Sequence, residues 1–132
     1  MDISNSKIEY YSKVLDILAD RHRIIAGNIA NINTPGYRTK DISNFQDVLG
    51  RVIAAKQEAF GQGAAGSVQE QFNDIDFEVS ALNAANPDSQ ANDVDIDKEM
   101  VKLTTNTLMY KAYVQVMLME LKHLNMAIKE RI

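Results

Sequence analysis

Residues 96–128, IDKEMVKLTTNTLMYKAYVQVMLMELKHLNMAI, decide the fold class of this chain. Large or apolar residues recur there in alternating steps of four and three, the 3.5-residue period of a coiled-coil helix. The members of this pattern are Ile96, Met100, Leu103, Thr107, Tyr110, Val114, Met117, Leu121, Leu124 and Ile128. The spacing predicts a C-terminal helix of about 35 residues, with Asp95 as its N-cap and acids in its first turn.

A second heptad pattern lies near the N-terminus and is interrupted by one polar residue, His22. Its members are Ile8, Tyr11, Leu15, Leu18, His22, Ile25, Ile29 and Ile32. This spacing predicts a helix of about 28 residues that packs against the C-terminal helix as an antiparallel coiled-coil hairpin. We expect the hairpin to bring together four residues: Ile25, Ile29, Leu121 and Leu124.

The apolar members of both patterns, apart from Ile96, form the predicted helix-packing interface. They are Ile8, Tyr11, Leu15, Leu18, Ile25, Ile29, Ile32, Met100, Leu103, Tyr110, Val114, Met117, Leu121, Leu124 and Ile128. Residues 108–119 (LMYKAYVQVMLM) are also apolar around most of the helix, since only Lys111 and Gln115 are polar. One partner helix cannot cover such a surface. The apolar surface that one partner helix leaves uncovered indicates one of two arrangements. Either further copies of the chain cover it, or the middle segment of the same chain covers it in a helical bundle.

The middle of the chain predicts less regular structure. Residues 44–58 favour a short third helix, and the AFGQGAAG stretch at 59–66 is typical of a flexible connection. Residues 68–79 alternate only partly, which fits short extended segments or a loose region, and residues 83–93 have a linker composition.

The predicted fold is therefore mainly α, with two long heptad helices, a short third helix and a loosely structured middle. We divide it into residues 1–40 (helix and turn), 41–92 (variable middle) and 93–132 (C-terminal helix), together forming one structural unit.

Composition excludes several classes of protein. The 132 residues are 45% hydrophobic, include no cysteine and carry a net charge of -4. Residues 41–97 contain two basic residues against eleven acids, and the ends are only mildly basic. No concentrated basic face of a nucleic-acid-binding protein is expected. No run reaches the roughly 18 to 20 apolar residues of a membrane span, and MDISNSKIEY lacks a signal-peptide pattern.

No enzyme signature is recognisable. His22 and His123 lie far apart in the sequence, without a nucleophile and base pattern near either, and the glycines do not form a phosphate-binding loop. We therefore expect no catalytic residues, no cofactor and no small-molecule substrate.

Alternate aspartates before the last helix resemble the start of a calcium-binding loop. Asp93, Asp95 and Asp97 match its first three ligand positions, but Lys98 and Thr104 replace the required glycine and glutamate. We therefore expect a helix start and no metal site.

Residues 28–38, NIANINTPGYR, are the most informative motif. Thr34 precedes a proline and so leaves the helical region, and Pro35 with Gly36 predicts a type II turn. Asn28 and Asn31 lie three residues apart on one face of the helix. Their amides are predicted to form hydrogen bonds with a neighbouring helix, with exposed carbonyls, or with a neighbouring subunit.

This motif resembles the N-terminal signature of the bacterial flagellar axial proteins, the rod and hook group. The residues that carry the resemblance are Asn28, Ile29, Ala30, Asn31, Thr34, Pro35, Gly36, Tyr37 and Arg38. The stretch Asn92–Met100, with Asn106 and Tyr110–Ala112, is similar to the short members that form the proximal rod. The resemblance covers residues 5–45 and 90–132, and the short middle leaves no room for the large domains of hook relatives.

The resemblance implies a structural subunit of the flagellar basal body. Members of this group leave the cell unfolded through the flagellar type III exporter without a cleaved signal. They polymerise through paired terminal helices into the periplasmic rod, a tube that transmits torque and encloses the export channel. The implied partners are copies of itself, other rod proteins, and the rod adaptor and export gate at the base, with no nucleic acid. Two alternatives remain: another short rod protein of the group, or a free-standing helical adaptor or secretion chaperone.

Overall fold

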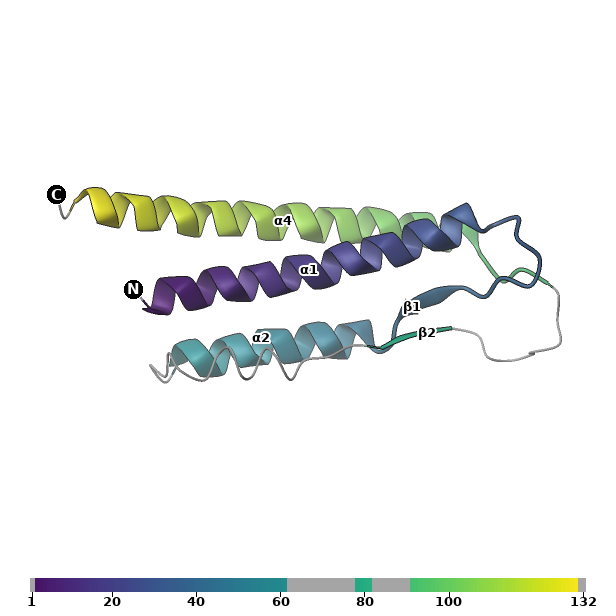
Figure 1. The fold of residues 1–132 in the computed structure, drawn as a ribbon, viewed down its shortest axis with the longest axis horizontal. Helices are drawn as coiled ribbons and strands as arrows, with labels where there is room; N and C mark the ends of the chain where they lie inside the picture. Colours follow the sequence, from purple (N-terminus) through teal and green to yellow (C-terminus); the bar gives the residue numbers. More distant parts are fainter. Residues whose placement is uncertain (1, 62–77, 82–90, 131–132) are drawn as a thin grey trace.

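In the part of the chain that the structure describes, three helices lie side by side, with a small two-stranded sheet at one end of the shortest (Figure 1). The computed structural model describes residues 2–61, 78–81 and 91–130. The elements are α1 (Asp2–Ala30), β1 (Lys40–Ile42), α2 (Phe45–Gly61), β2 (Val79–Ala81) and α4 (Ile96–Lys129). The mainly helical fold with two long terminal helices is confirmed, and these contain 29 and 34 residues.

The terminal helices run antiparallel, so the start of α1 lies beside the end of α4. Three polar contacts fix their register along the pair. Lys7 Nζ lies 3.3 Å from Glu120 Oε2 at one end, and Asn28 Nδ2 donates to Glu99 Oε2 at 2.9 Å near the other. Between them, Asn106 Nδ2 donates to the Leu18 carbonyl at 2.8 Å.

This register corrects one expectation about the hairpin. Ile25 and Ile29 lie at the end of α1 beside the beginning of α4, whereas Leu121 and Leu124 lie near the other end of α4. They cannot face one another, because antiparallel pairing places the end of α1 beside the start of α4.

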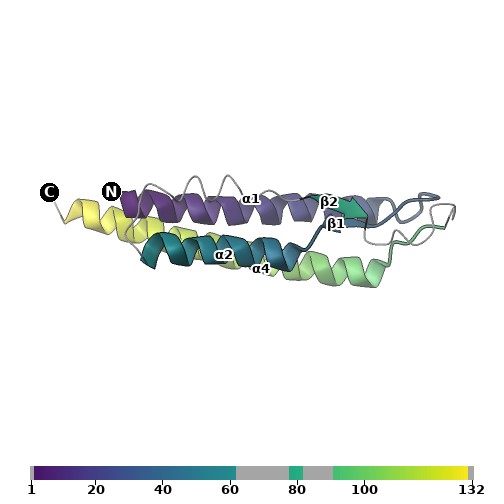
Figure 2. The ribbon, with the colours of Figure 1, turned by 90° about the horizontal axis from the view of Figure 1, so that it is seen from below.

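The hydrophobic core lies where α1 meets α2 and β1. Tyr10, Tyr11, Val14, Ile17 and Leu18 of α1 are buried together with Ile42 of β1 and Phe45, Val48, Leu49 and Val52 of α2. Helix α4 adds Met109, Tyr113, Val116 and Met117 at the edge of this cluster. Helix α1 is thus the central helix, between α4 and α2 in the view of Figure 1. Figure 2 shows that both partners are displaced toward the same side of α1.

The buried face of α1 includes part of the predicted heptad pattern and a line beside it. Of the heptad residues, Leu18 and Ile25 are fully buried, whereas His22 is exposed. Beside them, Val14 and Ile17 are at most 1% exposed. A heptad count assumes one partner helix. Because α1 contacts α4 and α2 together, its buried face is turned toward the space between these two partners.

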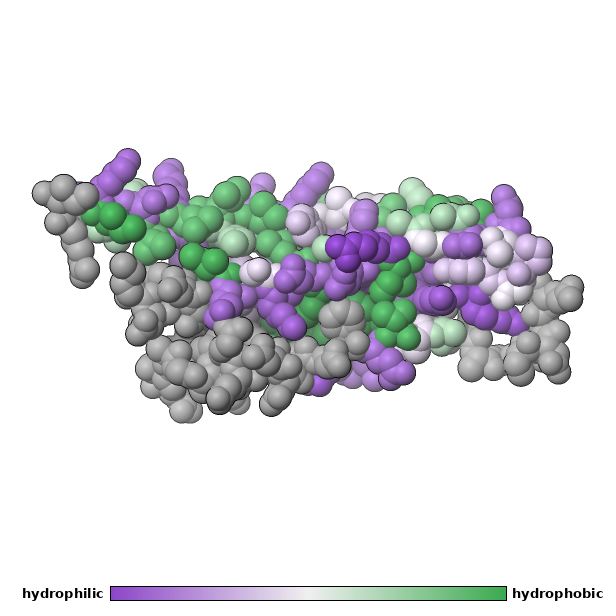
Figure 3. All heavy atoms as spheres, viewed as in Figure 1, coloured by the Kyte–Doolittle hydropathy of each residue, from purple (hydrophilic) through white to green (hydrophobic). Residues whose placement is uncertain are grey.

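The outer surface of α4 is rich in apolar side chains, as the space-filling view shows along this helix (Figure 3). Leu108 is 62% exposed, Leu118 59% and Met119 53%. The expectation that one partner helix cannot cover residues 108–119 is confirmed. None of the helices in the described part of the chain is long and apolar enough to cross a membrane.

The described residues of the middle of the chain form helix α2 and a short antiparallel ribbon. Helix α2 extends to Gly61, so residues 59–61 of the predicted connection are helical, and residues 62–66 lie outside the described residues. Lys40, Asp41 and Ile42 pair with Ala81, Ser80 and Val79, a ribbon that we did not predict. Of the stretches at 68–79 and 83–93, the structure describes only residues 78–79 and 91–93.

Candidate functional site: a polar joint at the end of the first helix

Helix α1 ends in a turn that follows the predicted design. The Tyr37 N–H donates to the Thr34 carbonyl at 3.3 Å, and Gly36 has a φ of 72°. These are the features of a type II turn with glycine at its third position. Asn31 Nδ2 donates to the Gly27 carbonyl at 2.8 Å, and its Oδ1 accepts from Thr34 Oγ1 at 3.1 Å. Asn31 therefore ties the end of α1 to the turn.

Asn28 is fully buried and uses its whole amide within the chain. Its Nδ2 donates to the Lys40 carbonyl at 2.7 Å and to Glu99 Oε2 at 2.9 Å. Its Oδ1 accepts from the Lys40 N–H at 3.0 Å and from the Tyr37 hydroxyl at 3.1 Å. One side chain thus joins α1, the turn, β1 and α4, so the predicted bond to a neighbouring subunit is replaced by bonds within the chain.

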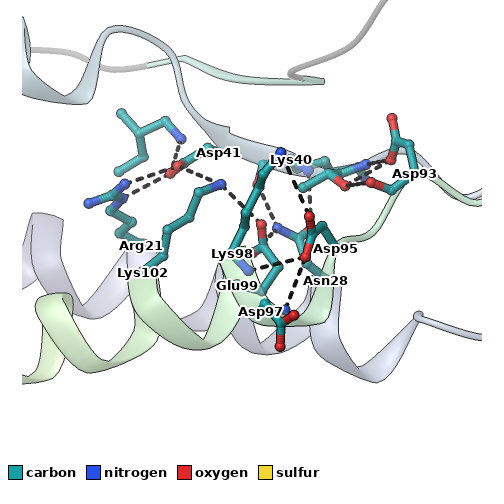
Figure 4. A network of polar contacts seen from close by, with 12 residues as sticks. Arg21, Asn28, Lys40, Asp41, Asp93, Asp95, Asp97, Lys98, Glu99 and Lys102 are labelled. Carbon is teal, nitrogen blue, oxygen red and sulfur yellow. Dashed lines mark hydrogen bonds and ion pairs between the residues drawn. The ribbon is translucent and has the colours of Figure 1, made fainter.

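A chain of charged groups continues from this point between the elements (Figure 4). Glu99 is 2% exposed, and its Oε1 accepts from Lys102 Nζ at 3.0 Å. Lys102 Nζ also lies 3.5 Å from Asp41 Oδ2. Arg21 holds the same Asp41 carboxylate in two hydrogen bonds of 2.9 and 3.0 Å, and its guanidinium lies 3.8 Å from the centre of the Phe45 ring. The two buried carboxylates in this group, those of Glu99 and Asp41, each have a basic side chain beside them. A buried ion needs such a partner to offset its loss of hydration.

A second set of bonds joins the turn to the segment before α4. Asn92 Nδ2 donates to the Asn31 carbonyl at 2.6 Å and to the Thr34 carbonyl at 2.8 Å. Asp93 Oδ1 accepts from both the backbone N–H and the hydroxyl of Thr39, at 2.6 and 2.8 Å. The chain is therefore clasped on both sides of the turn by the residues that lead into the last helix.

The ionisation of this joint favours the charged carboxylates. Burial raises the pKa of Asp41, but the hydrogen bonds and charge of Arg21 lower it more, so its pKa lies below the usual range. For Asp93, burial is likewise outweighed by the two Thr39 bonds and Arg38, and its pKa is lowered. Burial and the negative charges of Glu99 and Asp93 raise the pKa of the Tyr37 hydroxyl, which keeps it a donor to Asn28.

The predicted motif residues divide between the joint and the surface. Asn28 is buried, whereas Ile29, Asn31, Tyr37 and Arg38 are half-buried. The exposed members are Ala30, Thr34, Pro35 and Gly36. The turn residues therefore act through backbone conformation rather than by packing.

The predicted packing residues occupy three environments. The buried ones are Tyr11, Leu18 and Ile25, and the half-buried ones are Ile8, Leu15, Ile29, Ile32, Leu103, Val114, Met117, Leu121 and Leu124. Met100, Tyr110 and Ile128 are exposed by 39 to 46%.

Several residues of the joint were given no role by the sequence, namely Arg21, Asp41 and Lys102, and Glu99 was expected only as an acid in the first turn of the last helix. The apolar count that located the helices does not include charged residues. One signal was present, because Glu99 and Asn106 lie seven residues apart and therefore on one face of α4. This spacing could have indicated that Glu99 and Asn106 form a line of buried polar residues on α4.

Two of the three aspartates at the start of α4 bind backbone N–H groups through their carboxylates. Asp95 is the N-cap, as predicted, and its Oδ1 accepts from the N–H groups of Asp97 and Lys98. Asp93 is turned toward Thr39. Within residues 2–61, 78–81 and 91–130, no three histidine or acidic side chains are grouped as metal ligands.

Comparison with known proteins places these features in one family. Residues 18–38, which supply Arg21, Asn28 and the turn, match the model of the flagella basal body rod protein family. The flagellar basal body rod protein FlgB of Bacillus subtilis is 31% identical over 87% of this chain and 87% of its own length. FlgB of Salmonella typhimurium is 29% identical over 92% of both chains, and FlgB of Borrelia hermsii is 26% identical over 98% of this chain and all of its own. With this identity over nearly its whole length, the chain belongs to the FlgB family of flagellar basal body rod proteins.

Proposed function

We propose that this protein is a structural subunit of the proximal rod of the flagellar basal body. The observation that carries the proposal is the exposed apolar surface of α4, since Val101, Leu108, Leu118 and Met119 are each more than half exposed. Contiguous exposed apolar surface of this kind marks a protein–protein interface. Copies of the chain and other rod proteins would cover it, so the terminal helices would build the wall of the tubular rod.

The polar joint suits a part that transmits torque. Four elements meet at Asn28, and the buried Asp41 is held by a bidentate arginine, the strongest geometry for such a pair. Relative movement of α1 and α4 would break several of these bonds at once. We infer that the joint makes each subunit stiff, and that its role is structural rather than enzymatic.

The same proposal includes the export of the subunit from the cell and its other partners. The subunit would leave the cell through the flagellar type III exporter, without a cleaved signal, and would enclose the export channel in the periplasm. At the base of the rod it would contact the rod adaptor and the export gate. A free-standing adaptor or secretion chaperone is less well supported, because the exposed apolar surface follows nearly the whole length of α4.

Purification of basal bodies tests the role. In a strain without this gene, we expect no motility, and complementation with the wild-type gene should restore both motility and the chain in isolated basal bodies. A Leu108→Asp chain, altered only on the exposed face, should be made and exported but should not be retained in basal bodies. Motility of the deletion strain, or absence of the wild-type chain from basal bodies, would overturn the proposal.

A further inference from the structure

Helix α4 carries a second heptad line that faces away from α1. Its members are Val101, Thr105, Leu108, Ala112, Gln115, Met119, Lys122 and Met126, spaced by alternating fours and threes, and every one is exposed. Five of the eight members are apolar, and apolar side chains at this 3.5-residue spacing on the solvent side of a helix are typical of a seam for another helix. We call this line the outer seam of α4.

Helix α1 has a matching line on its own solvent side. It contains Glu9, Ser12, Asp16, Ala19, Arg23, Ala26 and Ala30, and all are exposed except the half-buried Ala19. Most of these side chains are small, and the line includes the exposed acid Asp16. We call this line the outer seam of α1.

We propose that the outer seam of α4 in one copy packs antiparallel against the outer seam of α1 in a second copy. In the register that pairs Met119 with Ala19, Leu108 faces Ala30, Ala112 faces Ala26 and Met126 faces Ser12. Large side chains then meet small ones along about 28 Å of helix. Such pairing lets two helices approach closely and exclude water.

Charge supports the same register. Lys122 falls opposite Asp16, with Asp20 one turn away, and Gln115 falls opposite Arg23. The other simple arrangement pairs two α4 outer seams with each other, Leu108 opposite Met119. It places Lys122 opposite Thr105 and leaves it without an acid. The contact between α4 and α1 is therefore the one with complementary charge as well as complementary size.

The two arrangements build different assemblies. Because α1 and α4 are already antiparallel within a copy, the proposed contact keeps all copies pointing the same way. A contact between two different surfaces repeats from copy to copy and forms rings or filaments, whereas a contact between identical surfaces closes at the dimer. This inference rests on the proposed rod function and names the surfaces that would join adjacent subunits.

The absence of cysteine from the chain permits a direct test by disulfide cross-linking. The first variant carries Ala19→Cys with Met119→Cys, and the second carries Leu108→Cys with Met119→Cys. Neither pair can close within one copy. Met119 lies roughly 20 Å along α4 from Asn106, the residue beside Leu18, and Leu108 lies roughly 16 Å from Met119 on the same helix. A disulfide needs Cα atoms about 4.4 to 6.8 Å apart.

Mild oxidation of isolated basal bodies should give a ladder of dimers, trimers and larger species for the first variant. The second variant should give at least tenfold less cross-linked product. A dominant dimer from the second variant, or no ladder from the first in basal bodies that contain it, overturns the proposed contact and leaves the rod function standing. Absence of the chain from basal bodies overturns the rod function instead. In that case, the same two variants are purified and oxidised at the highest attainable concentration, and their cross-linked products test the contact.

Charge exchange gives an independent readout. Asp16→Lys alone, or Lys122→Asp alone, should lower the ladder yield of the first variant several-fold, and the two together should restore it. The matched control is Asp47→Lys, which changes an exposed acid of α2 outside both seams and should leave the yield unchanged. Failure of the double exchange to restore the ladder, with both chains folded by circular dichroism, contradicts the register.

Discussion

Asn28 and Glu99 lie 71 positions apart in the chain, yet a 2.9 Å hydrogen bond joins their side chains in the buried contact between the two long helices. The same Asn28 amide binds Lys40 and Tyr37, so this contact connects the end of α1 to the turn and to β1. The family signature is therefore more than a helix ending. It supplies one of the residues that fix the position of the two helices relative to each other.

Asn28→Ala should destabilise the fold by about 2 to 4 kcal/mol. The change removes four hydrogen bonds and leaves the buried Glu99 with fewer partners, and unsatisfied buried groups cost about 1 to 3 kcal/mol each. Chemical denaturation would measure the loss. Asn31→Ala is the matched comparison, and a smaller loss of about 1 kcal/mol is expected because that side chain bonds only locally. Equal losses for the two variants would contradict a special role for Asn28.

Gly36→Ala should destabilise the protein although there is space for its Cβ. No heavy atom lies within 4 Å of that position, so the cost of about 1 kcal/mol comes from the positive φ of 72° alone. Gly36→Val should cost more, because a β-branched side chain tolerates this conformation poorly. Gly27→Ala is the control in the interior of α1, also in open space, and should stabilise by about 0.5 to 1 kcal/mol. Thermal unfolding of the three variants should show these opposite signs.

The free energy of unfolding should decrease as the pH falls below about 4. The pKa of Asp41 is lower in the folded protein than its unfolded value of about 3.9, and that of Asp93 is also lowered. Their contribution is complete at neutral pH and is lost as the pH falls through the folded pKa values, because the unfolded chain then binds protons first. Urea unfolding at several pH values would measure the slope. Asp41→Asn should be less stable at pH 7 but lose less stability on acidification, and an unchanged slope would exclude Asp41 as a source.

Two substitutions should separate folding from assembly. Ile17 is 1% exposed, so Ile17→Ala should cost about 2 to 5 kcal/mol of stability through the cavity it leaves. Leu108 is 62% exposed, so Leu108→Asp should change the free energy of unfolding by less than about 0.5 kcal/mol. Incorporation into basal bodies should nevertheless fail for Leu108→Asp. If Leu108→Asp unfolds the isolated chain, the outer face of α4 supports the fold and not the assembly.

Hydrophobic spacing located the helices because apolar residues recur at a 3.5-residue period along most of each long helix. The N-cap at Asp95 and the turn at Pro35–Gly36 were also predictable, since both depend on local backbone chemistry. The full buried face of α1 was not, because the heptad count omits residues such as Val14, which lies in the core that α1 forms with α2.

The polar part of the joint was the least predictable. Arg21 and Asp41 lie 20 positions apart and meet only because β1 returns along α1. The strands contain three residues each, too few to show the alternation of a half-buried strand. Contacts of this kind depend on how the chain returns after each helix. The apolar pattern of a single helix does not predict that path.

The antiparallel pairing of α1 and α4 places the first residues of one helix and the last residues of the other at the same end of the molecule (Figure 1). The opposite end carries the Gly36 turn and the clasp around it. A stack of identically oriented copies consequently has a direction: one end displays helix termini and the other displays the turn. Subunits arriving at the two ends meet different chemistry, so growth would be directional without any separate orienting factor.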